Sequence, residues 1–154
     1  MSEVCIRPAT AADVPQIVAL LADDPLGALR ESPDDLDPYL AAFAAVDADP
    51  HQLLLVAVRG DRTVGTLQLT VLPGLARRGA LRGQIEAVRV ARDERGTGLG
   101  ATLITRAVDE ARRRGCQLVQ LTSDATRPDA HRFYEKLSFT ATHVGFKLDL
   151  RAGP

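Results

Sequence analysis

Cysteine, aromatic residues and net charge are all scarce in this sequence. Cys5 and Cys116 are its two cysteines, too few for a disulfide framework, and neither stands in a C-x-x-C or His-rich spacing. The three histidines are also scattered without metal-ligand spacing, so we expect no metal site. A formal net charge of -1 lacks the basic excess that is typical of nucleic-acid binding.

Long apolar runs are absent too. No stretch approaches about 18 uninterrupted apolar residues, and the first residues, MSEVCIRPATAADV, lack the positive and apolar regions of a secretory leader. We therefore expect a cytoplasmic protein that neither enters a membrane nor binds nucleic acid.

The composition is otherwise that of an ordinary globular protein. Hydrophobic residues make up 45% of the chain and charged residues 25%, far from the values of disordered chains. A chain of 154 residues can bury about 68 to 70% of its unfolded surface in one core, and it contains no linker or repeat. The sequence predicts a single domain over residues 1–154.

The spacing of apolar residues predicts an α/β protein. Thr10 and Asp13 resemble a capping box before a first helix, and Ser32 and Pro33 predict the start of a second. Two β-rich runs around residues 60–61 predict an antiparallel hairpin. The predicted order is β-α-α-β-β-β-α-β-α-β-β, with one or two closing strands in FTATHVGFKLDL.

A glycine-rich segment lies between a predicted strand and the predicted long helix. It reads RDERGTGLGATL, with Gly96, Gly98 and Gly100 at every second position. The start of a helix carries unpaired N–H groups and about half a positive charge, and glycines let an anion approach the main chain without meeting a Cβ. Arg95 adds a cation beside the loop. The segment predicts a phosphate or pyrophosphate site.

The letters GTGLGA also satisfy the fingerprint of dinucleotide-binding folds. Asp124 follows about twenty residues later, where that fingerprint has an acidic residue. Against this alternative, the residues ARDER separate the strand from Gly96, whereas the fingerprint turns directly out of its strand. No Gly-Lys-Ser or Gly-Lys-Thr follows the glycines, which disfavours a phosphate-loop nucleotidase.

Two separate motifs occur in the order found in one known family. Arg95, Gly98 and Gly100 match a pyrophosphate loop of the form Arg or Gln, x, x, Gly, x, Gly or Ala. Residues 129–139, DAHRFYEKLSF, match a second motif, although Ser138 stands where glycine is usual. On these motifs the chain resembles the GNAT superfamily of N-acetyltransferases, and its tail is most similar to small-molecule members of the aminoalkylphosphonate type.

The resemblance implies a fold, a donor and a reaction. The fold would be a mixed central sheet of about six to seven strands flanked by about four helices. The donor would be acetyl-CoA, and an amine would attack its thioester directly in a ternary complex. The residues that the resemblance implies for binding acetyl-CoA are Val88, Val90, Arg95, Gly96, Thr97, Gly98, Leu99, Gly100 and Ala101.

Transfer to an amine needs a base, because an alkyl ammonium with a pKa of about 10 must lose a proton before it attacks. Glu86 is the candidate catalytic base, since it alternates with Val88 and Val90 and would share a face with apolar neighbours that raise its pKa. The alternative is a carboxylate at the rim of the sheet, paired with Arg82 or Arg89.

Departure of coenzyme A as a thiolate is helped by a hydroxyl that donates a proton to sulfur. Tyr134, in HRFYEKL, matches the tyrosine of the family motif and is the candidate for this catalytic role. The alternative for Tyr134 is packing on an amphipathic helix. His131 lies three residues earlier and is either a proton shuttle or a surface group.

The expected acceptor is a small-molecule amine. The stretch ADDPLGALRESPDDLDPY is rich in carboxylates, which attract a cation. The loop PGLARRGALRG supplies Arg77, Arg78 and Arg82, which suit a carboxylate or phosphonate on the same acceptor. A protein or peptide amine and a non-catalytic acyl-CoA-binding module stay open as alternatives, and so does a homodimer in which the closing strands pair with another subunit.

Overall fold

The structure is a computed structural model that describes residues 2–151. It falls into two compact parts, one up to Leu121 and one from Thr122 onward, and each is described by itself. The elements of the first part are β1 (Val4–Pro8), η1 (Ala11–Asp13), α1 (Val14–Ala22), α2 (Pro25–Arg30), α3 (Asp37–Ala48), β2 (Gln52–Arg59), β3 (Arg62–Leu72), α4 (Ala76–Gly79), β4 (Leu81–Val90), η2 (Arg92–Glu94), α5 (Leu99–Arg113) and β5 (Cys116–Gln120).

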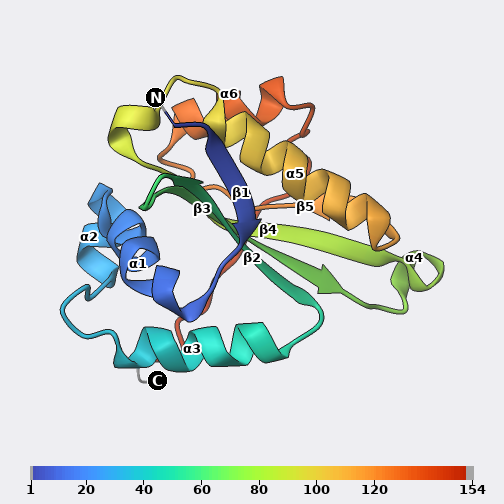
Figure 1. Ribbon diagram of the computed structural model, residues 1–154. Helices are drawn as coiled ribbons and strands as arrows, with labels where there is room; N and C mark the ends of the chain where they lie inside the picture. Colours follow the sequence, from blue (N-terminus) through green and yellow to red (C-terminus); the bar gives the residue numbers. More distant parts are fainter. Residues whose placement is uncertain (1, 152–154) are drawn as a thin grey trace. The chain divides into compact units, whose positions relative to one another are not determined.

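The five strands of the first part form one mixed sheet in the order β1-β2-β3-β4-β5 (Figure 1). The pairs from β1 to β4 are antiparallel, and the predicted hairpin joins β2 to β3 through Gly60, whose φ is 61°. Only β4 and β5 are parallel, with α5 as their connection. Such a sheet does not fit the dinucleotide-binding alternative, which requires repeated parallel βαβ units.

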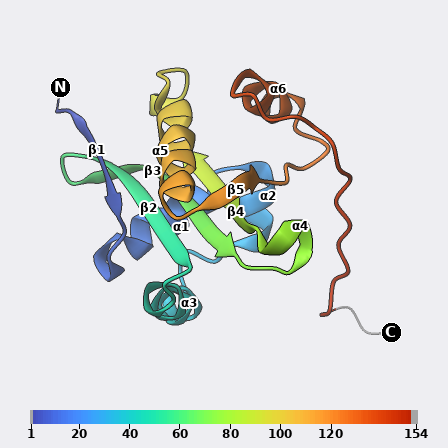
Figure 2. The same cartoon turned by 90° about the vertical axis from the view of Figure 1, so that its right-hand side faces the viewer.

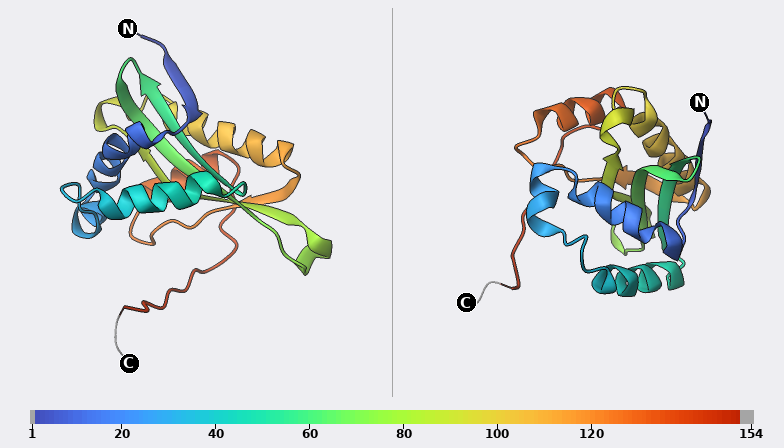
Figure 3. Two further views of the ribbon diagram at one scale, coloured as in Figure 1. Left: turned by 60° about the horizontal axis from the view of Figure 1, so that its bottom comes forward. Right: turned by 60° about the vertical axis from the view of Figure 1, so that its left-hand side comes forward.

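Helices cover both faces of this sheet. The buried side of α5 carries Leu103, Ile104, Ala107 and Ala111, and it packs on β3, β4 and β5. Helix α1 packs on β3 and β4 from the opposite face (Figures 2 and 3). Gly83 in β4 permits close packing of α5, because a Cβ at this position would lie 3.2 Å from the Cβ of Ala111.

The predicted capping box joins β1 to the first helix. The Thr10 N–H donates to Asp13 Oδ2 at 2.7 Å, and the Arg7 guanidinium donates to both Asp13 oxygens at 2.8 and 3.0 Å. Hydrogen bonds from Arg7 and Thr10 to the ionised carboxylate lower the pKa of Asp13 to about 2. The N-terminal strand is therefore tied to the helical layer by an ion pair between a buried carboxylate and a partly exposed guanidinium.

The second predicted helix begins later than the sequence suggested. Helix α3 starts at Asp37 with Pro38 in its first turn, and α2 is a further short helix that the sequence reading missed. The Tyr39 hydroxyl accepts a hydrogen bond from the Ser32 N–H at 2.8 Å and donates to Glu31 at 3.1 Å. These contacts hold the segment before α3 as a turn. The helix therefore begins at Asp37, with Pro38 in its first turn, and not at Pro33.

The described residues of the second part contain the helix α6 (Pro128–Lys136), close to the helix predicted over residues 128–137. Ser138 follows it with a φ of 72°, the left-handed geometry that explains why glycine is usual at this position. The predicted closing strands are wrong for the described residues, and the sheet has five strands rather than six to seven.

The tail after α6 keeps the apolar alternation on which the closing strands were predicted. Val144, Phe146, Leu148 and Leu150 alternate along it, yet each is at least 79% exposed. A strand also needs a neighbour for its N–H and C=O groups, and alternation alone does not supply one. None of the helices in residues 2–151 has the length and apolar character that a membrane crossing requires.

Candidate functional site

An irregularity in the middle of β4 shapes the site. Two residues of β4, Ala87 and Val88, stand opposite the single residue Leu67 of β3, between the register pairs Gln68–Glu86 and Thr66–Arg89. The φ of Ala87 is 55°, in the left-handed region that side chains other than glycine rarely adopt. This is a β-bulge with a strained residue, a combination found where a fold re-aims groups for function.

The bulge changes which side chains share a face. Glu86 and Arg89 face the same side of the sheet, because their partners Gln68 and Thr66 are two residues apart. Val90 pairs with Gly65, whose position faces α5. The expected common face of Glu86 with Val88 and Val90 is therefore wrong, and the Glu86 side chain is exposed.

The alternative role for Glu86 was an ion pair with Arg82 or Arg89. Arg89 does not form that pair. Its Nε lies 3.1 Å from Asp24 Oδ2, and both side chains are less than a fifth exposed. Asp24 also caps α2, since its Oδ1 accepts from the Gly27 N–H at 2.5 Å. This pair ties the link between α1 and α2 to β4 directly after the bulge.

Strands β4 and β5 separate before the bulge. Their parallel register ends at the pair Gln84–Gln120, and no described residue pairs with β4 on its β5 side from Ile85 to Val90. The Val88 carbonyl accepts from Arg89 Nη1 at 2.9 Å, and the Val90 carbonyl accepts from Arg95 Nε at 3.2 Å. The main chain of Val88 and Val90, which we expect to contact acetyl-CoA, is thus an unpaired strand edge whose carbonyl groups are held by Arg89 and Arg95.

The glycine loop follows directly and leads into α5. Gly96 and Gly98 have φ values of 78° and 89°, and Gly98 is the residue that precedes the helix. A Cβ on either glycine would meet no atom within 4 Å, so open space lies beside the loop. Because the first N–H groups of α5 lack helical partners, this loop fits the pyrophosphate of a coenzyme.

Contacts behind the loop hold it in place. The Thr97 hydroxyl donates to the Glu94 carbonyl at 2.6 Å. Arg59 donates to both carboxylate oxygens of Glu94, at 2.8 and 3.1 Å, and these hydrogen bonds lower the pKa of Glu94. The loop is therefore anchored to β2, although its sequence suggested only local structure.

The acidic stretch is partly neutralised within the chain. Asp23 lies 3.0 Å from Arg92 and 3.9 Å from Arg95, and Asp24 is held by Arg89. These two carboxylates are therefore less able to attract a cationic amine than the sequence suggested.

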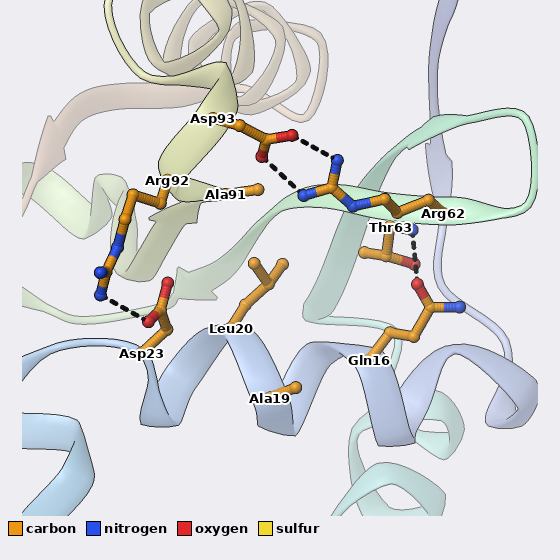
Figure 4. Close-up of a pocket in the computed structure, with 9 residues that line it drawn as sticks. All are labelled: Gln16, Ala19, Leu20, Asp23, Arg62, Thr63, Ala91, Arg92 and Asp93. Carbon is orange, nitrogen blue, oxygen red and sulfur yellow. Dashed lines mark hydrogen bonds and ion pairs between the residues drawn. The ribbon is translucent and has the colours of Figure 1, made fainter.

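A cleft of about 580 Å³ lies between α1, the start of β3 and the residues after β4 (Figure 4). Its charged side chains pair with one another: Arg62 donates to both oxygens of Asp93, and Arg92 to Asp23. Its lining includes neither Glu86 nor any of residues 95–101. We therefore do not assign the predicted chemistry to this cleft.

Tyr134 and His131 lie on α6 in the second part. The Tyr134 ring is half-buried and makes edge contacts with Phe133 and Phe139, at centroid distances of 5.1 and 5.9 Å. His131 Nε2 lies 2.8 Å from the Asp124 carbonyl oxygen. Tyr134 and Glu86 belong to separately described parts, so it stays a prediction that they act in one catalytic site.

Sequence reasoning missed two features of this site. The Asp24–Arg89 pair joins residues far apart in the chain, and Ala87 carries no local signal for a left-handed conformation. Both depend on the register between β3 and β4. An arginine in an otherwise apolar strand, as in AVRV, was the one available hint of a buried ion pair.

Comparison with known proteins agrees with the two motifs. The model of the acetyltransferase (GNAT) family matches residues 14–139. Aminoalkylphosphonate N-acetyltransferase of Salmonella typhimurium (strain LT2) is 31% identical over 144 residues, which are 93% of this chain and 90% of that protein.

Solved structures are similar over nearly the whole chain. A transcriptional regulator from Bacillus halodurans C-125 is 44% identical with a TM-score of 0.93, over 96% of this chain and 100% of that one. An acetyltransferase from Trypanosoma brucei is 31% identical with a TM-score of 0.81, again over 96% and 100%.

Proposed function

This chain belongs to the acetyltransferase (GNAT) family, and from that membership we propose that it acetylates the amine of a small molecule. It is an acetyl-CoA-dependent N-acetyltransferase, and acetyl-CoA is its co-substrate. The small-molecule acceptor is supported by the relative that is named for aminoalkylphosphonates. The alternative acceptor is the amine of a protein or peptide.

The observation that carries the proposal is the bulged, unpaired edge of β4 that leads into the glycine loop. Main-chain groups of Val88 and Val90 would bind the pantetheine amides, and residues 95–101 would hold the pyrophosphate at the start of α5. Bound acetyl-CoA supplies an activated acetyl thioester. The loop and the edge are contiguous, so one elongated ligand can occupy both.

Glu86 is the proposed base. It accepts a proton from the acceptor ammonium, directly or through water, and the freed amine nitrogen forms a bond to the acetyl carbon. The exposed position of Glu86 beside the bulge gives an acceptor free access to it. The Val88 N–H is the proposed donor to the carbonyl oxygen as negative charge develops there.

Tyr134 is the proposed acid. As the carbon–sulfur bond breaks, its hydroxyl donates a proton to the thiolate of coenzyme A and regains one from solvent. The match of Tyr134 to the family motif supports this role. The second proton of the original ammonium leaves to solvent, and Glu86 also releases its proton there. Because Tyr134 regains one proton, the products are acetyl-amine, free thiol and one proton.

The first experiment is thermal unfolding with acetyl-CoA, with NAD as the parallel ligand. A ligand at 100 times its dissociation constant adds about 2.7 kcal/mol of stability, so stabilisation by acetyl-CoA alone is expected. Thiol release is then measured with small amines and with lysine peptides. Release with peptides only would favour the alternative acceptor, and release with neither would overturn the proposed function.

The role of Tyr134 is tested by Tyr134→Phe, with Tyr39→Phe as the matched control. We expect the first variant to lower kcat by about 100-fold or more while acetyl-CoA still stabilises the protein, because the proton donor alone is lost. Equal kcat values for the two variants would contradict the role of Tyr134 at sulfur.

A further inference from the structure

A row of polar residues runs along β4 on the face opposite α5. Arg82, Gln84 and Glu86 alternate there with Gly83 and Ile85, which are buried against the α5 side. Arg82 and Gln84 are half-buried and Glu86 is exposed, so a small molecule can reach all three side chains. We call Arg82, Gln84 and Glu86 the β4 row.

Neighbouring strands support the middle of the row. Gln84 Oε1 accepts from Gln120 Nε2 at 3.2 Å across the parallel pair. On the other side, Gln52 Oε1 accepts from Gln68 Nε2 at 2.9 Å and from the Thr70 hydroxyl at 2.8 Å. These amides and hydroxyls lie on a sheet face where apolar side chains are usual, and they hold one another in place.

The two ends of the row carry opposite charges. Within residues 2–151, the side chains of Glu86 and Arg82 form no hydrogen bond or ion pair, whereas the Arg89 side chain on the same face is held by Asp24. Glu86 lies four positions after Arg82 along the strand, so their Cα atoms are about 13 Å apart. The Arg82 guanidinium extends toward Gly74 in the β3–β4 connection, which lengthens the row further.

We propose that the acceptor is an elongated primary amine with a second, anionic group, carboxylate or phosphonate, which Arg82 binds while the amine lies at Glu86. This inference rests on the proposed function and identifies the acceptor class within it. A guanidinium offers paired donors to a carboxylate or phosphonate, and the amides between the charged ends provide hydrogen bonds to the connecting atoms.

Arg82, rather than the neighbouring loop arginines, is the specificity-determining residue. Arg77 and Arg78 lie in the short α4 segment, fully on the surface, with φ values of 56° and 61°. They do not belong to the sheet face that carries Glu86. A rigid strand also holds Arg82 more firmly than a loop would, and firm placement increases specificity.

The test compares steady-state kinetics for matched amines. Each pair consists of an ω-amino acid or aminoalkylphosphonate and its neutral amide or ester of the same length. We expect Arg82→Gln to raise KM for the anionic member by about 10- to 100-fold, with little change for the neutral member or acetyl-CoA. Arg82→Lys should restore part of the loss, because it keeps the charge but not the paired donors.

Arg106→Gln serves as the control, since it removes an exposed arginine on α5, away from the row. Equal effects of Arg82→Gln on both members of each pair, or no effect on either, would overturn the inference and leave the proposed function standing. If the wild-type protein acetylates no amine, the proposed function fails, and the inference fails with it.

Discussion

The glycine loop and the bulge of β4 adjoin in the chain but differ in what creates their geometry. In the loop, Gly96 and Gly98 adopt left-handed conformations that glycine reaches at no steric cost. In the bulge, Ala87 adopts a similar φ against the preference of its side chain, because the β3–β4 register requires it. The proposed acetyl-CoA site is thus encoded locally, whereas the proposed acceptor site depends on how the strands pair.

The largest expected effect tests the bulge side of this comparison. Glu86→Gln should lower kcat by about 100- to 10,000-fold, because the ammonium loses its base, while acetyl-CoA affinity stays unchanged. Glu3→Gln, at an exposed carboxylate in the same part, is the control. If the kcat of Glu86→Gln stays within about threefold of the wild-type value, Glu86 is not the base.

The loop side is tested by two glycines with similar geometry at opposite ends of α5. Gly98 and Gly115 have φ values of 89° and 86°, and a Cβ on either would meet no atom within 4 Å. Gly98→Val and Gly115→Val should each lower the free energy of unfolding by about 1–2 kcal/mol.

Only Gly98→Val should also weaken acetyl-CoA binding, by about 100-fold, since its side chain would fill the space beside the pyrophosphate. Calorimetric titration measures the affinity. If both variants bind acetyl-CoA as the wild type does, the loop is not the pyrophosphate site.

A third change should alter stability without touching either region. Asp13→Asn should lower the free energy of unfolding at pH 7 by about 1–2 kcal/mol, less than the full pKa shift implies because Arg7 is partly exposed. Because folding lowers the pKa of Asp13 from 3.8 to about 2, the wild type has this stability above pH 3.8 and loses it as the pH falls through 2.

Urea unfolding of both proteins across this range measures the difference, which should vanish at the acid end. Acetyl-CoA affinity and kcat should remain those of the wild type at pH 7. An unfolding difference that persists below pH 2 would show that the Asp13 charge is not its source.

The smallest expected effect sharpens the comparison at the bulge itself. Ala87→Gly relieves the left-handed strain but adds freedom to the unfolded chain, so stability should change by no more than about 0.5 kcal/mol and activity should remain. Ala87→Val should instead lower stability by about 1–2 kcal/mol and reduce kcat, since a β-branched side chain resists this conformation. Similar behaviour of the two variants would indicate that the bulge does not need its left-handed residue.

Much of the fold could be predicted from local signals. The hairpin at Gly60, the capping pair Thr10–Asp13 and the long amphipathic helix all depend on residues close together in sequence. The start of α3 was misplaced, because two prolines each suit a first helical turn and contacts of Tyr39 decide between them. The closing strands failed because alternation does not provide a pairing partner.

The candidate site divides in the same way. Gly96 and Gly98 were singled out by the glycine-rich segment, and in the structure both have left-handed φ values. The surroundings of Glu86 were predicted wrongly, because simple alternation along β4 was assumed across Ala87. One inserted residue reverses the faces of all residues after it, so Arg89 took the place expected for a valine.

The sequence by itself determined the family, the acetyl donor and the loop that precedes α5, since these reside in short motifs whose conformations are local. Only the tertiary structure decided that Ala87 bulges, that Arg89 binds Asp24 and that Glu86 stands at the exposed end of a polar row. The physical reason is that strand register and ion pairs between distant residues are set by packing of the whole sheet against its helices.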